Sequence, residues 1–204
     1  MDALSGCVIM KLSRNAGQLH LRPEGEESAL GSLGDSYLRP VTQSFLSLGS
    51  NLGDRLGYLR ATVGALGRGP LLEVGGLSRV YETTPVEMEE EQPDYLNCVV
   101  KVRYGATAIE LLRFCQGVEA ALERVRGASG EKSPRTIDVD VLLFGEEVIE
   151  EPHLAVPHPG ILRTFNLKGL ADLAPDVYIP ERGVVAELLA GADLRGVWEL
   201  EEAL

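Results

Sequence analysis

Two stretches of this chain place apolar residues along one face of a helix, and this pattern constrains the fold more than any other feature. Side chains at i, i+4, i+7, i+11 and i+14 fall on a single helical stripe. The first stripe consists of Leu52, Leu56, Leu59, Val63 and Leu66. The second consists of Leu111, Cys115, Val118, Leu122 and Val125. The spacing predicts one helix that ends before Gly67 and another that runs to about Arg126.

Strand-like segments surround both predicted helices. Residues 44–48 form a short apolar run, and the following Gly49-Ser50-Asn51 can turn the chain and cap a helix. Residues 71–74 and 77–82 are extended segments that can pair as strands, and residues 96–102 and 137–143 alternate with the period of a strand. The order strand, helix, strand, strand, helix, strand predicts an α+β fold, a ferredoxin-like split βαβ sandwich with helices packed on an antiparallel-containing sheet.

The two ends of the chain differ from this central pattern. Residues 1–43 show no sustained period, and we expect an appended N-terminal segment of low order. Residues 44–204 then form the folded domain, with a short amphipathic helix around 184–189.

Composition limits the partners of the chain. Among its 204 residues, 19 Lys and Arg stand against 31 Asp and Glu, which gives a formal net charge of −12. That sign opposes binding to a nucleic-acid backbone, which depends on neutralising phosphates. No apolar run reaches the roughly 18 to 20 residues of a membrane span, and residues 6–10 lack the length and basic lead-in of a signal peptide. We therefore expect a cytoplasmic protein with no nucleic-acid and no membrane partner.

A pair of acids is the sharpest candidate for chemistry. Asp138 and Asp140 are two residues apart on a predicted strand, so both carboxylates lie on one face, with Cα atoms about 6.6 to 7 Å apart. Two such anions repel unless a cation lies between them, and oxygen ligands select Mg²⁺ or Ca²⁺. An isolated pair of this kind is equally compatible with a solvated strand face.

Basic residues gather beside this pair. Arg124, Arg126, Lys132 and Arg135 stand against only Glu131, in an otherwise acidic chain. Arginine binds phosphate oxygens bidentately while metals bridge other oxygens of the same polyphosphate, so the cluster favours phosphoryl transfer. An internal salt-bridge cluster is the alternative. Neither of the common glycine-rich phosphate loops occurs, so side chains and metals would hold a nucleotide.

Several blocks in order carry a resemblance to a known family. They are residues 48–55, 81–86, 92–97, 119–126 and 134–145, and residues 156–159 continuing through Arg163 and Phe165. With these blocks the chain resembles the 6-hydroxymethyl-7,8-dihydropterin pyrophosphokinases of folate biosynthesis over about residues 44–180. The family fold is ferredoxin-like, in agreement with the strand and helix order.

The resemblance implies transfer of diphosphate from ATP to the hydroxymethyl group of the pterin, with release of AMP. Asp138 and Asp140 would ligate two Mg²⁺ ions, and Arg124 and Arg135 would bind the transferring phosphates. The residues that match nucleotide contacts in the family are Gln116, Glu119, Arg126, Arg135, Val141, His158 and Arg163. Those that match the pterin slot are Thr83, Thr84, Val86, Tyr95, Asn97 and Phe165. Residues 127–134 would form a lid over ATP.

The chain departs from the family pattern at several places. The lid carries Glu131-Lys132-Ser133 where the family commonly has a tryptophan, and the spacing from His158 to Arg163 is one residue short. Small-molecule pterin and ATP are the expected ligands, and contact with other folate-pathway enzymes is left open.

Two other functions are compatible with parts of this pattern. A metal-dependent nucleotidyltransferase would also combine a Gly-Ser pair with paired aspartates, but its Gly-Ser stands much closer to them than Gly49 does to Asp138. It would release diphosphate in place of AMP. A non-enzymatic ligand-binding domain would keep the fold and bind ATP or pterin without turnover.

Overall fold

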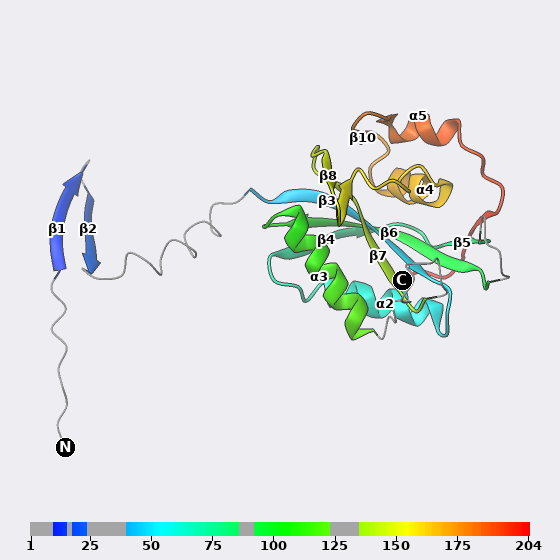
Figure 1. Ribbon diagram of the computed structural model, residues 1–204, viewed down its shortest axis with the longest axis horizontal. Helices are drawn as coiled ribbons and strands as arrows, with labels where there is room; N and C mark the ends of the chain where they lie inside the picture. The colour runs from blue at the N-terminus through cyan, green and yellow to red at the C-terminus, as the bar shows by residue number, and fades with distance from the viewer. Residues whose placement is uncertain (1–9, 16–17, 24–39, 86–91, 123–134) are drawn as a thin grey trace, which may run out of the picture. The chain divides into compact units, whose positions relative to one another are not determined.

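The computed structural model describes residues 10–15, 18–23, 40–85, 92–122 and 135–204 (Figure 1). The chain divides into two compact units, Met1–Arg39 and Pro40–Leu204. In the first unit, β1 (Met10–Asn15) and β2 (Gln18–Pro23) pair as an antiparallel hairpin, which the sequence pattern did not predict.

An antiparallel sheet forms the centre of the second unit. Its strands are β3 (Thr42–Ser50), β4 (Leu72–Leu77), β5 (Tyr81–Thr83), β6 (Tyr95–Tyr104), β7 (Asp138–Phe144) and β12 (Val197–Glu199). The order across the sheet is β12-β5-β6-β3-β7, and β4 also pairs with β6. The first strand of the motif thus lies between the third and the fourth, as in a ferredoxin-like sheet. This confirms the predicted fold class.

Helices cover both faces of this sheet (Figure 1). Helices α2 (Arg55–Leu66) and α3 (Ala108–Ala121) lie on one face, and α4 (Thr164–Leu173) and α5 (Val185–Ala190) lie on the other. The smaller strands form two hairpins, β8 (Ile149–Glu151) with β9 (Leu154–Val156) and β10 (Tyr178–Ile179) with β11 (Gly183–Val184).

The two-residue period of the strands divides the core into two layers. On β6, Cys98 and Val100 pack toward α2 and α3, whereas Val99 packs toward α4. Because both faces are covered, the middle of β6 is buried without interruption. The polar residues of the sheet's α4 face therefore lie where the strands extend past the helix, and this is where the candidate site is found.

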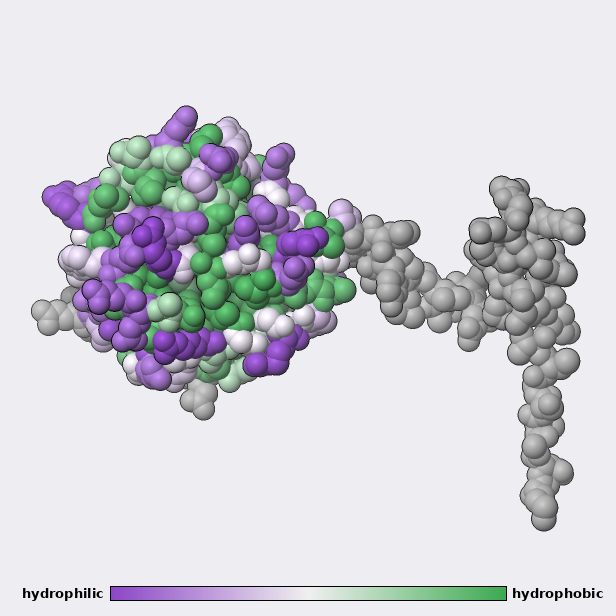
Figure 2. All heavy atoms as spheres, turned by 180° about the vertical axis from the view of Figure 1, so that it is seen from behind, coloured by the Kyte–Doolittle hydropathy of each residue, from purple (hydrophilic) through white to green (hydrophobic). Residues whose placement is uncertain are grey.

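The surface of this unit carries hydrophilic and apolar side chains interspersed, as one face shows in Figure 2. Among the helices that the structure describes, none combines the length and apolar character needed to cross a bilayer.

The first helix begins later than the sequence pattern predicted. Strand β3 continues through Ser50, so Gly49 and Ser50 belong to the sheet and do not turn the chain. The N-cap is Asp54, whose Oδ1 accepts a hydrogen bond from the backbone N–H of Gly57 at 2.9 Å. Leu52 precedes the helix and is 36% exposed, so it is not part of the buried stripe.

The second helix ends earlier than predicted, at Ala121 in place of about Arg126. The carbonyl of Leu122, at the C-cap, accepts a hydrogen bond from Thr136 Oγ1 at 3.2 Å. A side chain from a distant segment thus satisfies a group that would otherwise receive the next helical N–H. Periodicity alone cannot report such a contact.

Helix α4 was not predicted at all, and a glycine explains why. Gly169 is a poor helix former near the middle of the segment. The fold requires it because a Cβ at this position would lie 2.5 Å from Val99 Cγ2 on β6. At this position the close packing of α4 against β6 therefore outweighs the low helix propensity of glycine.

Two helical glycines give a matched test of this packing. Gly169→Ala should lower the free energy of unfolding by about 1 to 3 kcal/mol, because the methyl group overpacks the contact with β6. Gly117→Ala in α3 should raise it by about 0.5 to 1 kcal/mol, because an added Cβ there meets nothing within 4 Å. Urea unfolding of both variants measures the difference. Equal effects of the two substitutions would contradict the assigned contact.

Candidate active site

The paired aspartates lie on one face of β7. Val139 and Val141 point to the α2 and α3 side and are buried. Asp138 and Asp140 take the opposite side, where their side chains are 23% and 37% exposed. In the register with β3, Asp138 lies opposite Gly49 and Asp140 opposite Ser47. The two carboxylates are thus neither on opposite sides of the strand nor sealed in the core, and we call this side of the sheet the carboxylate face.

Arg135 stands directly before the strand and contacts the first carboxylate. Its Nη1 donates a hydrogen bond to Asp138 Oδ2 at 2.6 Å. Its backbone is held by Asn51, which is 1% exposed: Asn51 Oδ1 accepts from the Arg135 N–H at 2.8 Å, and the Asn51 N–H donates to the Arg135 carbonyl at 3.2 Å. Arg135 Nε is buried and has no acceptor in the part of the chain that the structure describes. The guanidinium is therefore positioned beside Asp138 with one donor unused.

His158 and Arg163 lie in the connection between β9 and α4. His158 Nε2 is 3.8 Å from Asp140 Oδ1. Burial lowers the pKa of His158 below its ordinary value and the charge of Arg163 lowers it further, while Asp138 opposes the shift. The Gly160 N–H donates to His158 Nδ1 at 3.1 Å, so a neutral imidazole carries its proton on Nε2, the nitrogen toward Asp140.

The other half of the carboxylate face is built by β5 and β6. Asn97 is 4% exposed, and its Nδ2 donates to Thr83 Oγ1 at 2.9 Å. Asn97 pairs in register with Gly49, the residue that lies opposite Asp138 on its other side. A Cβ on Gly49 would lie 3.1 Å from Asn97 Oδ1 and 4.0 Å from Tyr95 Cδ1. Gly49 therefore leaves open the space between Asn97 and Asp138.

Further residues predicted for the pterin slot lie at the same end of the sheet. Thr83 and Tyr95 are register partners, and Tyr95 is half-buried. Thr84 follows β5 and is exposed, and Phe165 stands on the first turn of α4, half-buried. Val86 lies outside the described residues, as do Arg124, Arg126 and the 127–134 segment expected to form the lid.

Three residues expected at the nucleotide lie on the other side of the sheet. Glu119 on α3 is 2% exposed, and its Oε1 accepts a hydrogen bond from the Val139 N–H at 2.8 Å. Val141 is 2% exposed and packs in the core layer under α2 and α3. Gln116, one turn before Glu119, is half-buried. The structure thus does not bring Glu119 and Val141 to the carboxylate face. Glu119 instead satisfies a backbone donor on the open edge of β7.

Sequence reasoning missed residues that organise the carboxylate face. Gly49 and Asn51 were interpreted as a turn, and their roles beside Asn97 and Arg135 depend on strand register. Asn166 on α4 was missed with its helix; it is 3% exposed and accepts a hydrogen bond from Ser47 Oγ at 2.7 Å. A polar residue between Phe165 and Leu167 was the one signal available for it.

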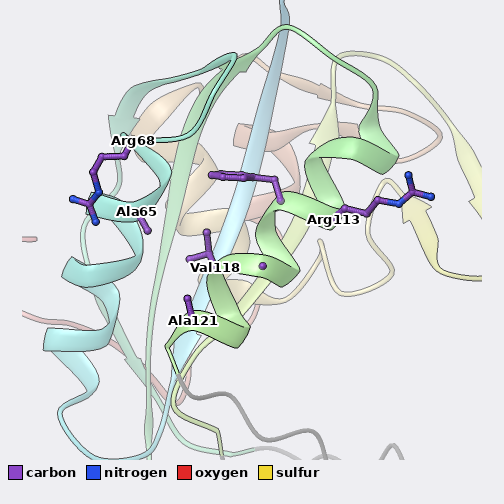
Figure 3. Close-up of a pocket in the computed structure, with 7 residues that line it drawn as sticks. Ala65, Arg68, Arg113, Val118 and Ala121 are labelled. Atoms are coloured by element: carbon purple, nitrogen blue, oxygen red, sulfur yellow. The ribbon is translucent and has the colours of Figure 1, made fainter. Parts of the chain in front are cut away.

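Two hollows lie on the surface of the second unit. One of about 440 Å³ lies between α2 and α3, where Arg68 and Arg113 flank Ala65, Val118 and Ala121 (Figure 3). A second, of about 200 Å³, lies beside the β8–β9 hairpin and includes His158 in its wall. The first is on the helices that cover the side of the sheet opposite the carboxylate face.

A ferredoxin-like domain that presents paired carboxylates beside an arginine is compatible with the enzymes that transfer phosphoryl groups. The family model of 7,8-dihydro-6-hydroxymethylpterin-pyrophosphokinase matches residues 45–175, and the chain belongs to this family. A Pseudomonas aeruginosa protein named 2-amino-4-hydroxy-6-hydroxymethyldihydropteridine pyrophosphokinase is 34% identical over 164 residues, which are 80% of this chain and 99% of that protein. A Bacillus subtilis protein of the same name is 40% identical over 135 residues, 66% of this chain and 79% of the relative.

A solved structure supports the fold. The Plasmodium falciparum HPPK-DHPS chain superposes with a TM-score of 0.59 at 15% identity, over 74% of this chain. This chain spans 45% of that longer one, so the similarity concerns the fold alone.

Family membership confirms the predicted activity. The chain is an ATP-dependent diphosphokinase of folate biosynthesis that transfers diphosphate to the hydroxymethyl group of 6-hydroxymethyl-7,8-dihydropterin and releases AMP. The nucleotidyltransferase alternative, which would release diphosphate, is thereby excluded.

The structural role of Glu119 can be tested separately from nucleotide binding. Glu119→Leu should lower the free energy of unfolding by about 1 to 3 kcal/mol, because it leaves the Val139 N–H without an acceptor. Glu119→Gln keeps an oxygen at the same place and should cost less. Urea unfolding gives the stabilities, and amide hydrogen exchange at Val139 reports the bond itself. Unchanged exchange in the leucine variant would show that the bond is not formed.

Proposed function

We propose that the diphosphoryl transfer takes place on the carboxylate face, over the ends of β3, β6 and β7. The observation that carries the proposal is the common orientation of Asp138 and Asp140, partly exposed and flanked by Arg135 and His158. An alternating strand buries one side and presents the other, so both carboxylates are offered to the same ligand. The residues proposed for the pterin lie across Gly49 on the same face, which supports binding of both substrates on one continuous surface.

The donor set fits Mg²⁺. Two carboxylates supply hard oxygen ligands, and Mg²⁺ commonly uses one or two carboxylates together with substrate phosphates and waters. In the described ranges no group of three or more His, Cys, Asp or Glu is arranged to hold a metal, so the protein would supply only part of each coordination shell. We assign two ions to Asp138 and Asp140. When bound, such ions neutralise charge on the phosphates and lower the pKa of a coordinated alcohol.

Arg135, His158 and Arg163 are proposed to bind the ATP phosphates. Arg135 Nε is buried and lacks an acceptor in the described residues, so a phosphate oxygen can satisfy it. Neutral His158 presents an Nε2–H donor toward Asp140, where it could donate to phosphates that metal ions would hold near this carboxylate. The family match adds Arg124 as a catalytic phosphate ligand and Arg126 at the nucleotide, with residues 127–134 closing over ATP. It also adds Gln116, which would have to meet the nucleotide past β7 at the end of the sheet, because α3 lies on the other side.

Thr83, Thr84, Val86, Tyr95, Asn97 and Phe165 are proposed to form the pterin slot. Asn97 is oriented by Thr83, which leaves its Oδ1 toward the space above Gly49. An amide in that position can recognise the hydrogen-bonding edge of a heterocycle, and Tyr95 and Phe165 supply aromatic surface for stacking.

The side chains then contribute to the reaction mainly by position and charge. Asn97 and the aromatic residues orient the pterin hydroxymethyl group toward the phosphates, and Arg135 and Arg163 oppose the negative charge that develops there. Closure of the site excludes water, which competes with the pterin alcohol for the same phosphorus atom. No residue of the described chain needs to act as a strong base in this scheme.

We further propose that residues 44–204 form the catalytic domain, that the protein is cytoplasmic, and that it contacts other enzymes of folate biosynthesis. The name HPPK-DHPS of the Plasmodium falciparum chain, which joins two names in one polypeptide, supports the last point.

Asparagine variants of the two aspartates test the assignment of the site. Asp138→Asn and Asp140→Asn should each reduce AMP formation more than about 100-fold, because the metal ligands lose their charge. The assay contains hydroxymethyldihydropterin, ATP and Mg²⁺, and EDTA should abolish the wild-type signal. Asp176→Asn, the same change at an exposed position, is the control. Full activity of either site variant with intact circular dichroism would refute the assignment.

A methyl group at position 49 tests the proposal that Gly49 lies between the pterin site and the phosphate site. Gly49→Ala places a Cβ 3.1 Å from Asn97 Oδ1. We expect the KM for the pterin to rise about tenfold or more, as when one methyl group is added to a tight pocket, with the KM for ATP changed less than about twofold. Gly64→Ala on α2 is the matched control, since its Cβ meets only Arg68 Nη1 at 3.6 Å. An unchanged pterin KM would place the slot elsewhere.

A further inference from the structure

Asn166 lies where the apolar contact between α4 and the sheet gives way to the carboxylate face. It is 3% exposed. Its Oδ1 accepts a hydrogen bond from Ser47 Oγ at 2.7 Å, and its Nδ2 donates to the Gly160 carbonyl at 2.9 Å. One end of this buried amide is thus bound to the sheet and the other to the loop before α4.

The chemistry of the two partners sets the orientation of the amide. The Gly160 carbonyl can only accept a hydrogen bond, so the NH₂ group of Asn166 must face it. The oxygen then faces Ser47, whose hydroxyl donates. The opposite orientation would bring two acceptors together in a buried site, which costs free energy.

The two partners of Asn166 are neighbours of proposed phosphate-binding groups. Ser47 is the register partner of Asp140 on β7. Gly160 donates its N–H to His158 Nδ1, and a Cβ on Gly160 would lie 3.3 Å from Arg163 Nε. The amide therefore bridges the strand pair that carries Asp140 and the loop that carries His158 and Arg163.

The bridge adds to a backbone contact at the start of the loop, where the His158 N–H donates to the Leu142 carbonyl on β7 at 3.0 Å. The side chains themselves are farther apart: His158 Nε2 and Asp140 Oδ1 are separated by 3.8 Å, longer than a hydrogen bond. Helix α4 cannot approach the sheet more closely, because Gly169 already contacts Val99 one turn further on. The Ser47–Asn166–Gly160 chain then sets how far Gly160 and the residues after it stand from the strand.

We infer that Asn166 is a positioning residue, whose amide holds residues 160–163, and through the Gly160 N–H the ring of His158, in the arrangement that binding of the nucleotide phosphates requires. The inference rests on the proposed roles of His158 and Arg163. Nucleotide phosphates that must contact two separate elements lose affinity when one of those elements shifts by about 1 Å.

A double variant separates positioning from stability. Asn166→Leu with Ser47→Ala removes both buried polar partners while keeping similar shape, so the free energy of unfolding should change little. The tie to Gly160 is lost, and the KM for ATP should rise about tenfold while the pterin KM stays within about twofold. Ser47→Ala alone breaks the sheet end of the bridge but leaves Asn166 bound to Gly160, so its ATP KM should rise less than that of the double variant.

A second variant covers the case in which the double variant does not fold. Asn166→Asp has the same shape and still accepts from Ser47, but it loses the donor to Gly160. It should raise the KM for ATP by about tenfold or more. An ATP KM equal to wild type in whichever of these two variants folds would overturn the inference.

The imidazole of His158 gives a readout that needs no substrate. The chain has three histidines, so a His20→Gln and His153→Gln background leaves His158 alone in the ¹⁵N spectrum. At about pH 8.5, above the ordinary histidine pKa, the hydrogen bond from the Gly160 N–H to His158 Nδ1 should hold the ring as the Nε2–H tautomer. The double variant should show a mixture of tautomers, whereas Ser47→Ala should not.

These readouts distinguish the two possible failures. If the wild-type protein forms no AMP, the proposed site fails while the tautomer experiment still tests the bridge. If AMP forms and the tautomer of the double variant is unchanged, the bridge is not what holds the loop.

Discussion

The antiparallel pairing of β3 with β6 on one side and β7 on the other is the constraint on which the site depends. Through it, Gly49 lies between Asn97 and Asp138, and Ser47 lies opposite Asp140. A slip of one residue between β3 and β7 would turn both aspartates toward the core under α2 and α3 and bring valines to the surface. The burial of Val139 and Val141 therefore stabilises the register that exposes the carboxylates.

The covering of both sheet faces explains where a site can form. Helices α2 and α3 pack along one side, and α4 with α5 packs on the other over Phe45, Val99 and the end of β7. The uncovered strand ends on the α4 side carry glycine, asparagine and aspartate. Asn166 stands at this boundary, and its amide forms hydrogen bonds with Ser47 on the sheet and with Gly160 in the loop. Helix α4 thus contributes apolar residues to the core and a polar residue to the edge of the candidate site.

Local patterns predicted the parts of the fold that depend on neighbours in sequence. The alternation of residues 137–143 was enough to place Asp138 and Asp140 on one face, and helical stripes located α2 and α3. Long-range contacts decided the rest: the end of α3 depends on Thr136, α4 depends on the fit of Gly169 against Val99, and the position of Arg135 depends on Asn51. Glu119 shows the same limit, because its partner is a backbone group twenty residues away.

Three carboxylates near β7 have different environments, and their environments distinguish a structural role from a role in ligand binding. Glu119 is buried and used by a backbone N–H, Asp138 is paired with Arg135, and Asp140 is the most exposed and faces His158. In a chain of net charge −12, a polyanionic nucleotide is repelled at long range. In the proposed site, binding depends on charges within a few ångströms, where Arg135, Arg163 and the proposed divalent cations would outweigh the screened field of the remaining acids. The rigid placement of those few groups, by Asn51 on one side and Asn166 on the other, is what the surrounding fold provides.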